Sequence, residues 1–256
     1  MKRKIIIALC IVGALALIVG ATLLIIYLVK LGEYKKMDIK LSADFTYTAH
    51  TGCCNTDDNS LESIDVAVSN GADIVEFDIY YNGKEHVLSH DAPKGGEVTL
   101  REAFALLKEY DGLRANVDVK DTTEIAKVQE LAQEMGVLDR IFFTGIEAGD
   151  VKAVQEGCPL IPYYLNMTVI SPDEHADNYY RNIAKNVKQR GAIGINFSKE
   201  NATRELVECF HNEGLLVSVW TVNDTLTMYE MLSYGVDNIT TRRPDKMQEI
   251  ITEIGE

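Results

Sequence analysis

Basic residues are scarce in this 256-residue chain. Lysine and arginine together number 25 against 39 aspartates and glutamates, and the formal net charge is -14. Residues 1–36 hold six of the basic residues and only one acidic residue, so the rest of the chain is more acidic than the whole. Such a charge repels nucleic acid and attracts divalent cations. The composition therefore argues against a nucleic-acid partner.

Cysteine and proline are also too few to organise the fold. The five cysteines show no paired metal-ligand spacing: Cys10, the adjacent Cys53 and Cys54, Cys158 and Cys209. They define neither a disulfide framework nor a zinc site. Residues 37–256 also lack a low-complexity stretch, a proline-rich linker and an obvious internal repeat. We therefore divide the chain into an N-terminal segment, 1–36, and a single domain, 37–256.

Charge is absent from one long stretch near the N-terminus. Residues 5–29 form an unbroken apolar run in which Thr22 and Tyr27 are the only partly polar members. A helix of 25 residues, at about 1.5 Å per residue, reaches roughly 37 Å, more than the ~30 Å hydrocarbon core of a bilayer. A cleavable signal peptide has a shorter apolar stretch and a small-residue cleavage site. The run therefore predicts an uncleaved transmembrane signal anchor.

The charges that flank this run are nearly balanced. Residues 2–4 are basic on one side, and Lys30, Lys35 and Lys36 are basic on the other. The positive-inside rule is therefore almost tied. The compact N-terminal cluster favours a cytoplasmic N-terminus, so we expect a single-pass protein of the cell membrane with its domain outside.

Short apolar runs alternate with amphipathic segments along the domain. The runs predict eight strands, at 46–50, 74–79, 115–120, 141–145, 160–166, 192–197, 215–221 and 238–241. Helical periodicity follows each of them, at 59–70, 99–110, 122–135, 147–156, 173–190, 201–213, 224–234 and 243–254. Ser60, Thr122 and Asp224 suit helix starts. This pattern predicts an α/β fold, a (β/α)8 TIM barrel with its site at the carboxyl ends of the strands; a doubly wound open sheet is the alternative.

An Asn82-Gly83 pair interrupts the alternation. It stands between an apolar run that ends at Tyr81 and another that begins at Val87, and Asn-Gly favours a tight hairpin turn. We therefore expect an antiparallel excursion from the second strand that carries His90 back over the barrel mouth.

Acidic residues stand at the predicted strand ends. Glu76 and Asp78 are two apart on one strand, so their side chains share a face, and Asp118 and Lys120 have the same spacing on the next. A single acidic residue in a strand usually faces solvent, but several in apolar strands are costly to bury without a partner. Converging carboxylates also raise one another's pKa unless a cation lies between them. Hard oxygen ligands without thiolates favour Ca²⁺ or Mg²⁺ over zinc.

Two of the five histidines are placed at the predicted rim. His50 follows the first strand, and His90 follows the hairpin. We interpret these two as functional, and we interpret His86, His175 and His211 as structural.

These motifs resemble the glycerophosphodiester phosphodiesterase family, whose barrel opens with His-Arg-Gly and continues through Pro-Glu-Asn-Thr, Gly-Ala-Asp-x-x-Glu-x-Asp and His-Asp. The corresponding stretches here are His50-Thr51-Gly52, Asp57-Asp58-Asn59-Ser60, Gly71-Ala72-Asp73-Ile74-Val75-Glu76-Phe77-Asp78 and His90-Asp91. The segments 219–224 and 235–245 also look like that family's ending. The resemblance covers nearly all of residues 46–245.

The resemblance implies a phosphoric diester hydrolase that converts glycerophosphodiesters to glycerol 3-phosphate and an alcohol. Glu76 and Asp78 would be metal ligands, with Asp118 as the third where the family usually has Glu. His50 and His90 would be the acid/base pair. The implied cofactor is a divalent cation, Ca²⁺ or Mg²⁺, and the implied partners are a small-molecule diester and, through the N-terminal helix, a membrane.

Phosphate binding is where the sequence departs from the family. By resemblance, Lys120 would neutralise phosphate charge and Trp220 would take part in substrate binding. Thr51, which we also place in the predicted phosphate-binding site, stands where the family has an arginine that looks like a phosphate clamp. A hydrogen bond to a charged group is worth about 1.5–3 kcal/mol, so its loss would cost roughly ten- to a hundredfold. Our hypothesis is that Arg242, at the last strand end, supplies the missing charge.

Two other functions stay open from the sequence. Because Thr51 replaces the arginine, the barrel could bind phosphorylated ligands without turnover. It could also be a related phospholipase that acts on another head group, since such enzymes share the barrel and its histidines.

Overall fold

The structure is a computed structural model that describes residues 2–170 and 176–255. The chain separates into two compact units, with the division between Ile39 and Lys40. Each unit is described by itself below.

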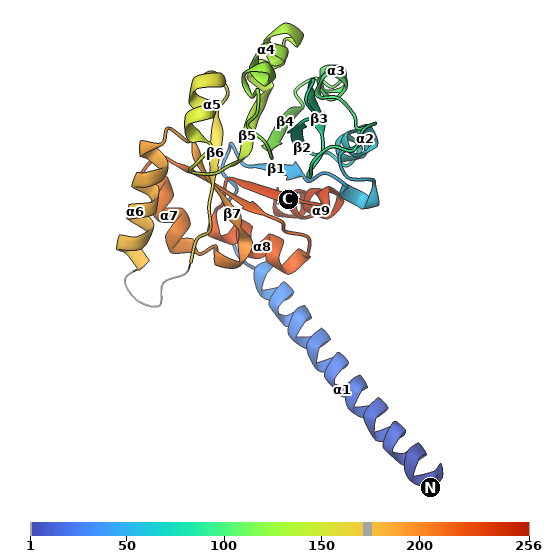
Figure 1. The fold of residues 1–256 in the computed structure, drawn as a ribbon. Coiled ribbons are helices and arrows are strands. Elements are labelled where there is room, and N and C mark those ends of the chain that lie inside the picture. Colours follow the sequence, from blue (N-terminus) through green and yellow to red (C-terminus); the bar gives the residue numbers. More distant parts are fainter. Residues whose placement is uncertain (1, 171–175, 256) are drawn as a thin grey trace. The chain divides into compact units, whose positions relative to one another are not determined.

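The first unit contains one long helix, α1, Lys2–Tyr34, drawn in blue in Figure 1. Within it, Val12–Tyr34 is long and apolar enough to cross a membrane, with a mean hydropathy of 2.7. Its large apolar side chains are exposed to the surroundings, as Leu17 is at 77%. A helix that is apolar on all sides is typical of a membrane span or a buried core. Membrane anchors and signal sequences share this length and composition.

The second unit is a closed barrel of eight parallel strands. They are β1 Thr46–Ala49, β2 Ile74–Tyr81, β4 Arg114–Val119, β5 Ile141–Ile146, β6 Tyr163–Asn166, β7 Gly194–Ser198, β8 Leu216–Trp220 and β9 Asn238–Thr241. The ring closes because β1 pairs with β2 on one side and with β9 on the other, where Thr48 lies beside Ile74 and Thr240. The predicted TIM barrel is confirmed, and the open sheet is excluded.

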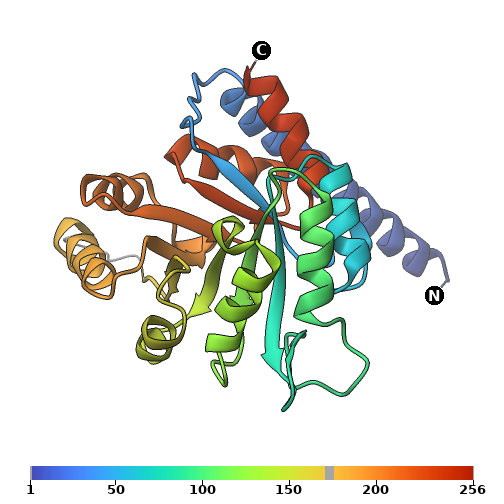
Figure 2. The same cartoon turned by 90° about the horizontal axis from the view of Figure 1, so that it is seen from above.

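Helices follow the strands and surround the barrel, as Figure 2 shows from above. They are α2 Leu61–Ser69, α3 Leu100–Glu109, α4 Ala126–Met135, α5 Val151–Gly157, α6 Ala176–Gln189, α7 Arg204–Asn212, α8 Thr225–Tyr234 and α9 Pro244–Gly255. The side chains of Ser60 and Asp224 accept hydrogen bonds from the backbone N–H groups of Ser63 and Thr227. These bonds satisfy otherwise unpaired donors at the starts of α2 and α8, as predicted.

Some helix starts differ from the prediction: α5 begins at Val151 instead of 147, and α7 begins at Arg204 instead of 201. Thr122 does not begin α4: its backbone oxygen accepts from the N–H of Ile125 in a turn, and Glu124 has a φ of 53°. The helix therefore starts only at Ala126. The predicted start of the helix at 173–190 lies at 173–175, outside the described residues.

The predicted hairpin is confirmed. Strand β3, His86–Leu88, runs antiparallel to β2, with Ile79 opposite Leu88. The side-chain oxygen of Asn82 accepts hydrogen bonds at 2.9 Å from the two backbone N–H groups that follow Gly83. Gly83 has a φ of +93°, which glycine adopts without a steric penalty. The turn thus reverses the chain and returns it toward the end of β2.

Polar side chains fill part of the barrel interior, where branched apolar residues are usual. Asn116, Thr144, Asn196 and Asn238 are each no more than 5% exposed. Thr144 Oγ1 donates to Asn116 Oδ1 at 2.8 Å, and Asn238 Nδ2 donates to Thr48 Oγ1 at 3.0 Å. Hydrogen bonds of this kind compensate for burying polar groups. They also place donors and acceptors below the carboxyl ends of the strands.

Candidate active site

Three carboxylates meet at the ends of two neighbouring strands. Glu76 and Asp78 lie on β2, and Asp118 lies on β4, where it pairs in register with Asp78. Side chains two residues apart on a strand share a face, so all three point into the barrel mouth. One oxygen atom from each lies within 4.8 Å of the others. The structure thus brings together the three predicted metal ligands.

The loop between β1 and α2 holds two of these carboxylates. Glu76 Oε2 accepts from the backbone N–H of Thr51 at 2.7 Å. Asp78 Oδ2 accepts from Asn59 Nδ2 at 2.8 Å, and Asn59 Oδ1 accepts from the backbone N–H of Asp78 at 2.9 Å. Asn59 therefore fixes Asp78 through both the nitrogen and the oxygen of its side-chain amide, a role that was not predicted from the sequence.

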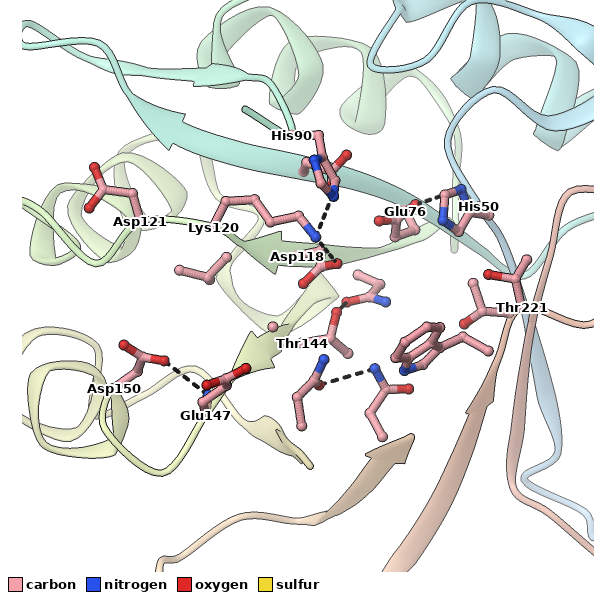
Figure 3. A pocket seen from close by; sticks show the side chains of 18 of the residues that line it. His50, Glu76, His90, Asp118, Lys120, Asp121, Thr144, Glu147, Asp150 and Thr221 are labelled. Carbon is pink, nitrogen blue, oxygen red and sulfur yellow. Dashed lines mark hydrogen bonds and ion pairs between the residues drawn. The ribbon is translucent and has the colours of Figure 1, made fainter. Parts of the chain in front are cut away.

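Lys120 forms ion pairs with both Asp78 and Asp118. Lys120 Nζ lies 3.0 Å from Asp78 Oδ1 and 2.8 Å from Asp118 Oδ2, and Figure 3 shows its side chain reaching Asp118. Burial tends to lower the pKa of Lys120, but the charges of Asp118 and Asp78 outweigh it and raise the pKa. The ammonium group therefore stays charged and neutralises part of the cluster.

One positive charge does not balance three carboxylates. Burial, and then the charges of Asp78 and Asp118, raise the pKa of Glu76 well above its ordinary value. Burial also raises the pKa of Asp118 against the opposing charge of Lys120. Asp118 Oδ1 is buried and has no hydrogen-bond partner among the described residues. Hard oxygen ligands with such an unpaired atom fit a divalent cation, Ca²⁺ or Mg²⁺.

The two histidines predicted to be catalytic stand beside this cluster. His50 follows β1, and its Nδ1 lies 2.8 Å from the backbone oxygen of Thr51 and 3.7 Å from Glu76 Oε2. An Nδ1–H that donates to this oxygen leaves Nε2 as an acceptor. Burial lowers the pKa of His50, which favours that neutral form. His90 follows β3 and is exposed, with its Nδ1 3.1 Å from Asp91 Oδ1.

A cavity of about 600 Å³ connects these groups at the carboxyl ends of the strands. His50, His90, the three carboxylates and Lys120 all line it, and so does Trp220 from the end of β8. Trp220 is 40% exposed, so its ring is accessible to a ligand. This is the end of a TIM barrel at which active sites lie.

Two residues predicted to bind substrate are not among those that line the cavity. Thr51 is 2% exposed, and its hydroxyl accepts a hydrogen bond from the backbone N–H of Asn59. Its side chain therefore stabilises the loop, which corrects the predicted contact with substrate. Arg242 instead forms an ion pair with Asp58, with 2.7 Å between Nη1 and Oδ1.

Gly52 makes room for this ion pair. Its φ of +70° is in the left-handed region, and a Cβ there would collide with Asp58 Oδ1 and Arg242 Nη1. The pair thus rests on the loop that follows His50. Burial is the main reason for the lowered pKa of His50, and the charge of Arg242 adds to it.

The far side of the cavity was not predicted. Asp121, Glu147 and Asp150 line it from the loops after β4 and β5, and Asn166 and Asn196 line it from β6 and β7. Acidic residues in loops are common on surfaces, so nothing in the sequence marks these three as neighbours. The asparagines do carry a usable signal, because each interrupts an apolar strand and is costly to bury without a partner.

The remaining histidines lie apart from these lining residues. His86 is 5% exposed and packs against Tyr81, with 5.2 Å between the ring centroids. His211 Nε2 lies 2.8 Å from Asp237 Oδ2 on the outer side of the barrel. Both fit the predicted structural roles, whereas His175 lies outside the described residues.

The adjacent thiols Cys53 and Cys54 lie in the loop after His50, in a short 3-10 helix. Neither forms a disulfide. Burial raises the pKa of Cys53 to about 11, so this thiol stays protonated at neutral pH.

One family model and several known proteins are similar to this chain. The model of the "Glycerophosphoryl diester phosphodiesterase family" matches residues 85–246, more than half of the chain. This range contains His90, Asp118 and Lys120 and begins after Glu76. A curated glycerophosphodiester phosphodiesterase from Bacillus altitudinis is 23% identical over an alignment of 161 residues, and the match covers 60% of this chain and 62% of that protein. The match thus spans less than two thirds of that relative.

Solved structures share the fold. A glycerophosphodiester phosphodiesterase from Parabacteroides distasonis superposes with a TM-score of 0.70 at 21% identity, covering 83% of this chain and 99% of that one. A phosphodiesterase from Oleispira antarctica, solved in complex with the product sn-glycerol-3-phosphate, superposes with a TM-score of 0.69 at 19% identity, covering 81% and 96%. At identities this low, the superpositions demonstrate a shared fold alone.

Proposed function

The chain belongs to the glycerophosphoryl diester phosphodiesterase family, and from this premise we propose that it is a membrane-anchored, metal-dependent hydrolase that splits glycerophosphodiesters into glycerol 3-phosphate and an alcohol. One observation carries the proposal. Two histidines, three carboxylates and a charged lysine line a single cavity at the carboxyl ends of the barrel strands. The name of the relative from Bacillus altitudinis and the product bound to the Oleispira antarctica protein agree with this substrate class.

Glu76, Asp78 and Asp118 are the proposed ligands of a divalent cation. When bound, such an ion stabilises the negative charge that develops on the phosphoryl oxygens, which is worth several kcal/mol. Thr51 and Asn59 orient the ligands through the hydrogen bonds to Glu76 and Asp78. All the donor atoms are carboxylate oxygens, which suits Ca²⁺ and Mg²⁺.

The two histidines are the proposed acid/base pair. His50 has a lowered pKa and an unprotonated Nε2 when Nδ1–H donates to the Thr51 carbonyl, so we assign it the removal of a proton from the attacking hydroxyl group. His90 would then donate a proton to the departing alkoxide, and Asp91 Oδ1, 3.1 Å from its Nδ1, would orient the ring. Proton transfer of this kind contributes roughly 10²–10⁴-fold to the rate.

Three further residues complete the proposed substrate site. Lys120 lies between Asp78 and Asp118, where its charge would also attract the phosphate. Trp220 offers an accessible ring to the organic part of the diester. Arg242 would contact the phosphate only after leaving its ion pair with Asp58, because its guanidinium is held at the rim.

A non-catalytic barrel is the second candidate. Two observations favour it: Asp58 engages Arg242, and Thr51 is buried. Among the described residues that line the cavity, Lys120 is therefore the one lysine or arginine. This alternative predicts binding of phosphorylated ligands without turnover.

Helix α1 is the proposed membrane anchor. Its length, its apolar surface and the basic residues at both ends are consistent with a single span, and we propose that the barrel lies outside the cell membrane. Accessibility of the barrel to protease in intact cells tests this placement. Protection of the barrel in intact cells, with digestion after lysis, would reverse the assigned orientation.

The function is tested with the full-length protein in detergent. It is incubated with glycerophosphoethanolamine, glycerophosphocholine and glycerophosphoglycerol, each with Ca²⁺, with Mg²⁺ and with a chelator. We expect glycerol 3-phosphate to be released only in the presence of a divalent cation. Retained ligand binding without product from any diester would support the non-catalytic barrel instead.

A further inference from the structure

The cavity carries more negative charge than the proposed reaction requires. Figure 3 shows Asp121, Glu147 and Asp150 along one side and His50 on the other. Lys120 is the one lysine or arginine among the described residues that line the cavity, and it is engaged by Asp78 and Asp118. The three acidic residues of the far side are thus left without a neighbouring cation in the cavity.

Backbone hydrogen bonds fix the positions of two of these residues. Asp121 Oδ1 accepts from the backbone N–H of Thr123 at 3.0 Å. Asp150 Oδ2 accepts from the backbone N–H of Glu147 at 3.0 Å. Each carboxylate keeps its second oxygen for other contacts, and the carboxylate of Glu147 projects from an exposed residue beside them. This side of the cavity is therefore ordered and able to accept more hydrogen bonds.

An unsatisfied acceptor lines the same side. Asn196 on β7 is 5% exposed, and its Nδ2 donates to Asn166 Oδ1 at 3.1 Å. Asn196 Oδ1 has no hydrogen-bond partner among the described residues. A buried acceptor without a donor is unfavourable, so this position is satisfied only when a donor arrives from elsewhere. The carboxylates and this amide oxygen all accept the same kind of ligand group, a hydrogen-bond donor.

We propose that the side of the cavity formed by Asp121, Glu147, Asp150 and Asn196 is a subsite for a positively charged alcohol group of the substrate, preferably one with a primary ammonium. This inference rests on the proposed diesterase function and specifies its substrate class. A phosphodiester carries two esterified alcohols, which point in different directions from the tetrahedral phosphorus. With the phosphate beside Lys120, one alcohol faces the ends of β4 to β7.

Charge and donor count distinguish the candidate head groups. A primary ammonium brings a positive charge and three N–H donors. A quaternary ammonium brings the charge without donors, and it can also lie against the ring of Trp220. A neutral polyol brings donors without charge, and an anionic group is repelled by the carboxylates. The order of preference should therefore be primary ammonium, quaternary ammonium, neutral polyol.

The experiment compares kcat/KM of the full-length protein for glycerophosphoethanolamine, glycerophosphocholine and glycerophosphoglycerol in the presence of the divalent cation. We expect the ethanolamine diester to exceed the glycerol diester by about tenfold, because one charged contact typically contributes that much. Raising the salt concentration should lower this ethanolamine-to-glycerol ratio toward one, because salt screens the solvent-accessible carboxylates of the rim.

Two variants locate the effect. Glu147→Gln keeps the size of the side chain and removes its charge, and it should lower the ethanolamine-to-glycerol ratio about fivefold. Glu156→Gln is the matched control: Glu156 lies on α5, is exposed and does not line the cavity, so it should leave the ratio unchanged. Asn196→Leu removes the unsatisfied acceptor and should lower the ethanolamine-to-choline ratio about threefold.

The outcomes separate this inference from the function on which it rests. Equal turnover of the three diesters by the unaltered protein overturns the subsite and leaves the hydrolase in place. So does an equal loss for all three in Glu147→Gln, which would place the glycerol that they share on this side. If none of the three diesters is hydrolysed, both proposals are overturned.

Discussion

The two sides of the cavity carry similar numbers of carboxylates but stabilise them differently. On the side of β1 to β4, Glu76, Asp78 and Asp118 are largely enclosed, and each is bound by a backbone N–H, an amide or an ammonium group. On the side of β4 to β7, the acidic residues lie at the rim and face no basic side chain among the described residues that line the cavity.

The difference teaches what each side requires. Enclosed carboxylates raise one another's pKa and need a permanent cation, here Lys120 and a proposed metal ion. Carboxylates at the rim are partly solvated, so they tolerate being unpaired and remain available to a ligand. The first side is therefore suited to chemistry and the second to recognition. The predictions that follow test this contrast.

Removal of either histidine should have the largest effect. His50→Gln and His90→Gln keep a polar side chain but cannot transfer the proton, so kcat for glycerol 3-phosphate release should fall about 10²–10⁴-fold. His211→Gln, beside Asp237 on the outer side of the barrel, is the control and should retain activity. If kcat fell by less than about tenfold in both His50→Gln and His90→Gln, neither histidine would transfer a proton in the slow step.

Divalent cation should stabilise the folded protein, and more so at higher pH. The pKa of Glu76 is raised in the folded state, so above the ordinary carboxyl value of about 4.3 the folded chain without metal binds more protons than the unfolded chain. The free energy of unfolding of the metal-free protein therefore decreases as the pH rises from about 4.3 to the raised pKa of Glu76. A bound cation replaces the proton and removes this loss.

The measurement is thermal unfolding of the full-length protein with and without cation. At a concentration about a hundredfold above Kd, the gain should be about 2.7 kcal/mol, and the difference in Tm should grow from about pH 5 to about pH 8. Glu76→Gln should weaken the pH dependence of this difference and leave the part that Asp118, whose pKa is also raised, contributes. A cation effect that is the same at both pH values would contradict the proposed charge balance.

Loss of the lysine charge should have an intermediate effect. Lys120→Met removes the ammonium between Asp78 and Asp118, so kcat/KM should fall about ten- to a hundredfold. Lys152→Met, on the exposed surface of α5, is the matched control. If kcat/KM of Lys120→Met stayed within a factor of two of the control, the charge of Lys120 would not contribute to substrate binding or turnover.

The rim ion pair should have the smallest effect, and its two members should act in opposite directions. Arg242→Ala removes a charge that we expect to reach the phosphate, and KM should rise about three- to tenfold. Asp58→Asn releases the guanidinium and should lower KM. Arg101→Ala, an exposed arginine paired with Glu134, is the control. If both rim variants raised KM alike, the pair would be a structural support for the loop after His50.

Local sequence patterns predicted much of the backbone because they act over a few residues. The Asn82-Gly83 turn gave the hairpin, and the two-residue spacing of Glu76 and Asp78 gave their common face. The start of α4 was placed wrongly at Thr122, since a turn preceding the helix uses that residue. A capping residue type is compatible with both structures, so its identity alone did not decide between them.

Contacts between distant segments were not predictable in the same way. Arg242 and Asp58 are 184 positions apart in the chain, and nothing in either local sequence indicates their ion pair. The buried hydroxyl of Thr51 was equally hidden, because its partner is a backbone N–H in the following turn. Asn59 belongs to one of the motifs identified in the sequence, but its two hydrogen bonds with Asp78 depend on how the loop folds over β2.

The sequence by itself determined the apolar helix, the alternation that makes a barrel, and the identities of the carboxylates, lysine and histidines at the strand ends. Those features follow from hydrophobic periodicity and from the geometry of a single strand. Only the tertiary structure decided that Thr51 faces inward, that Asp58 holds Arg242, and that Asp121, Glu147 and Asp150 share one wall with Asn196. The physical reason is ring closure: pairing of β1 with both β2 and β9 fixes the neighbours of every strand end, and no local pattern encodes those neighbours.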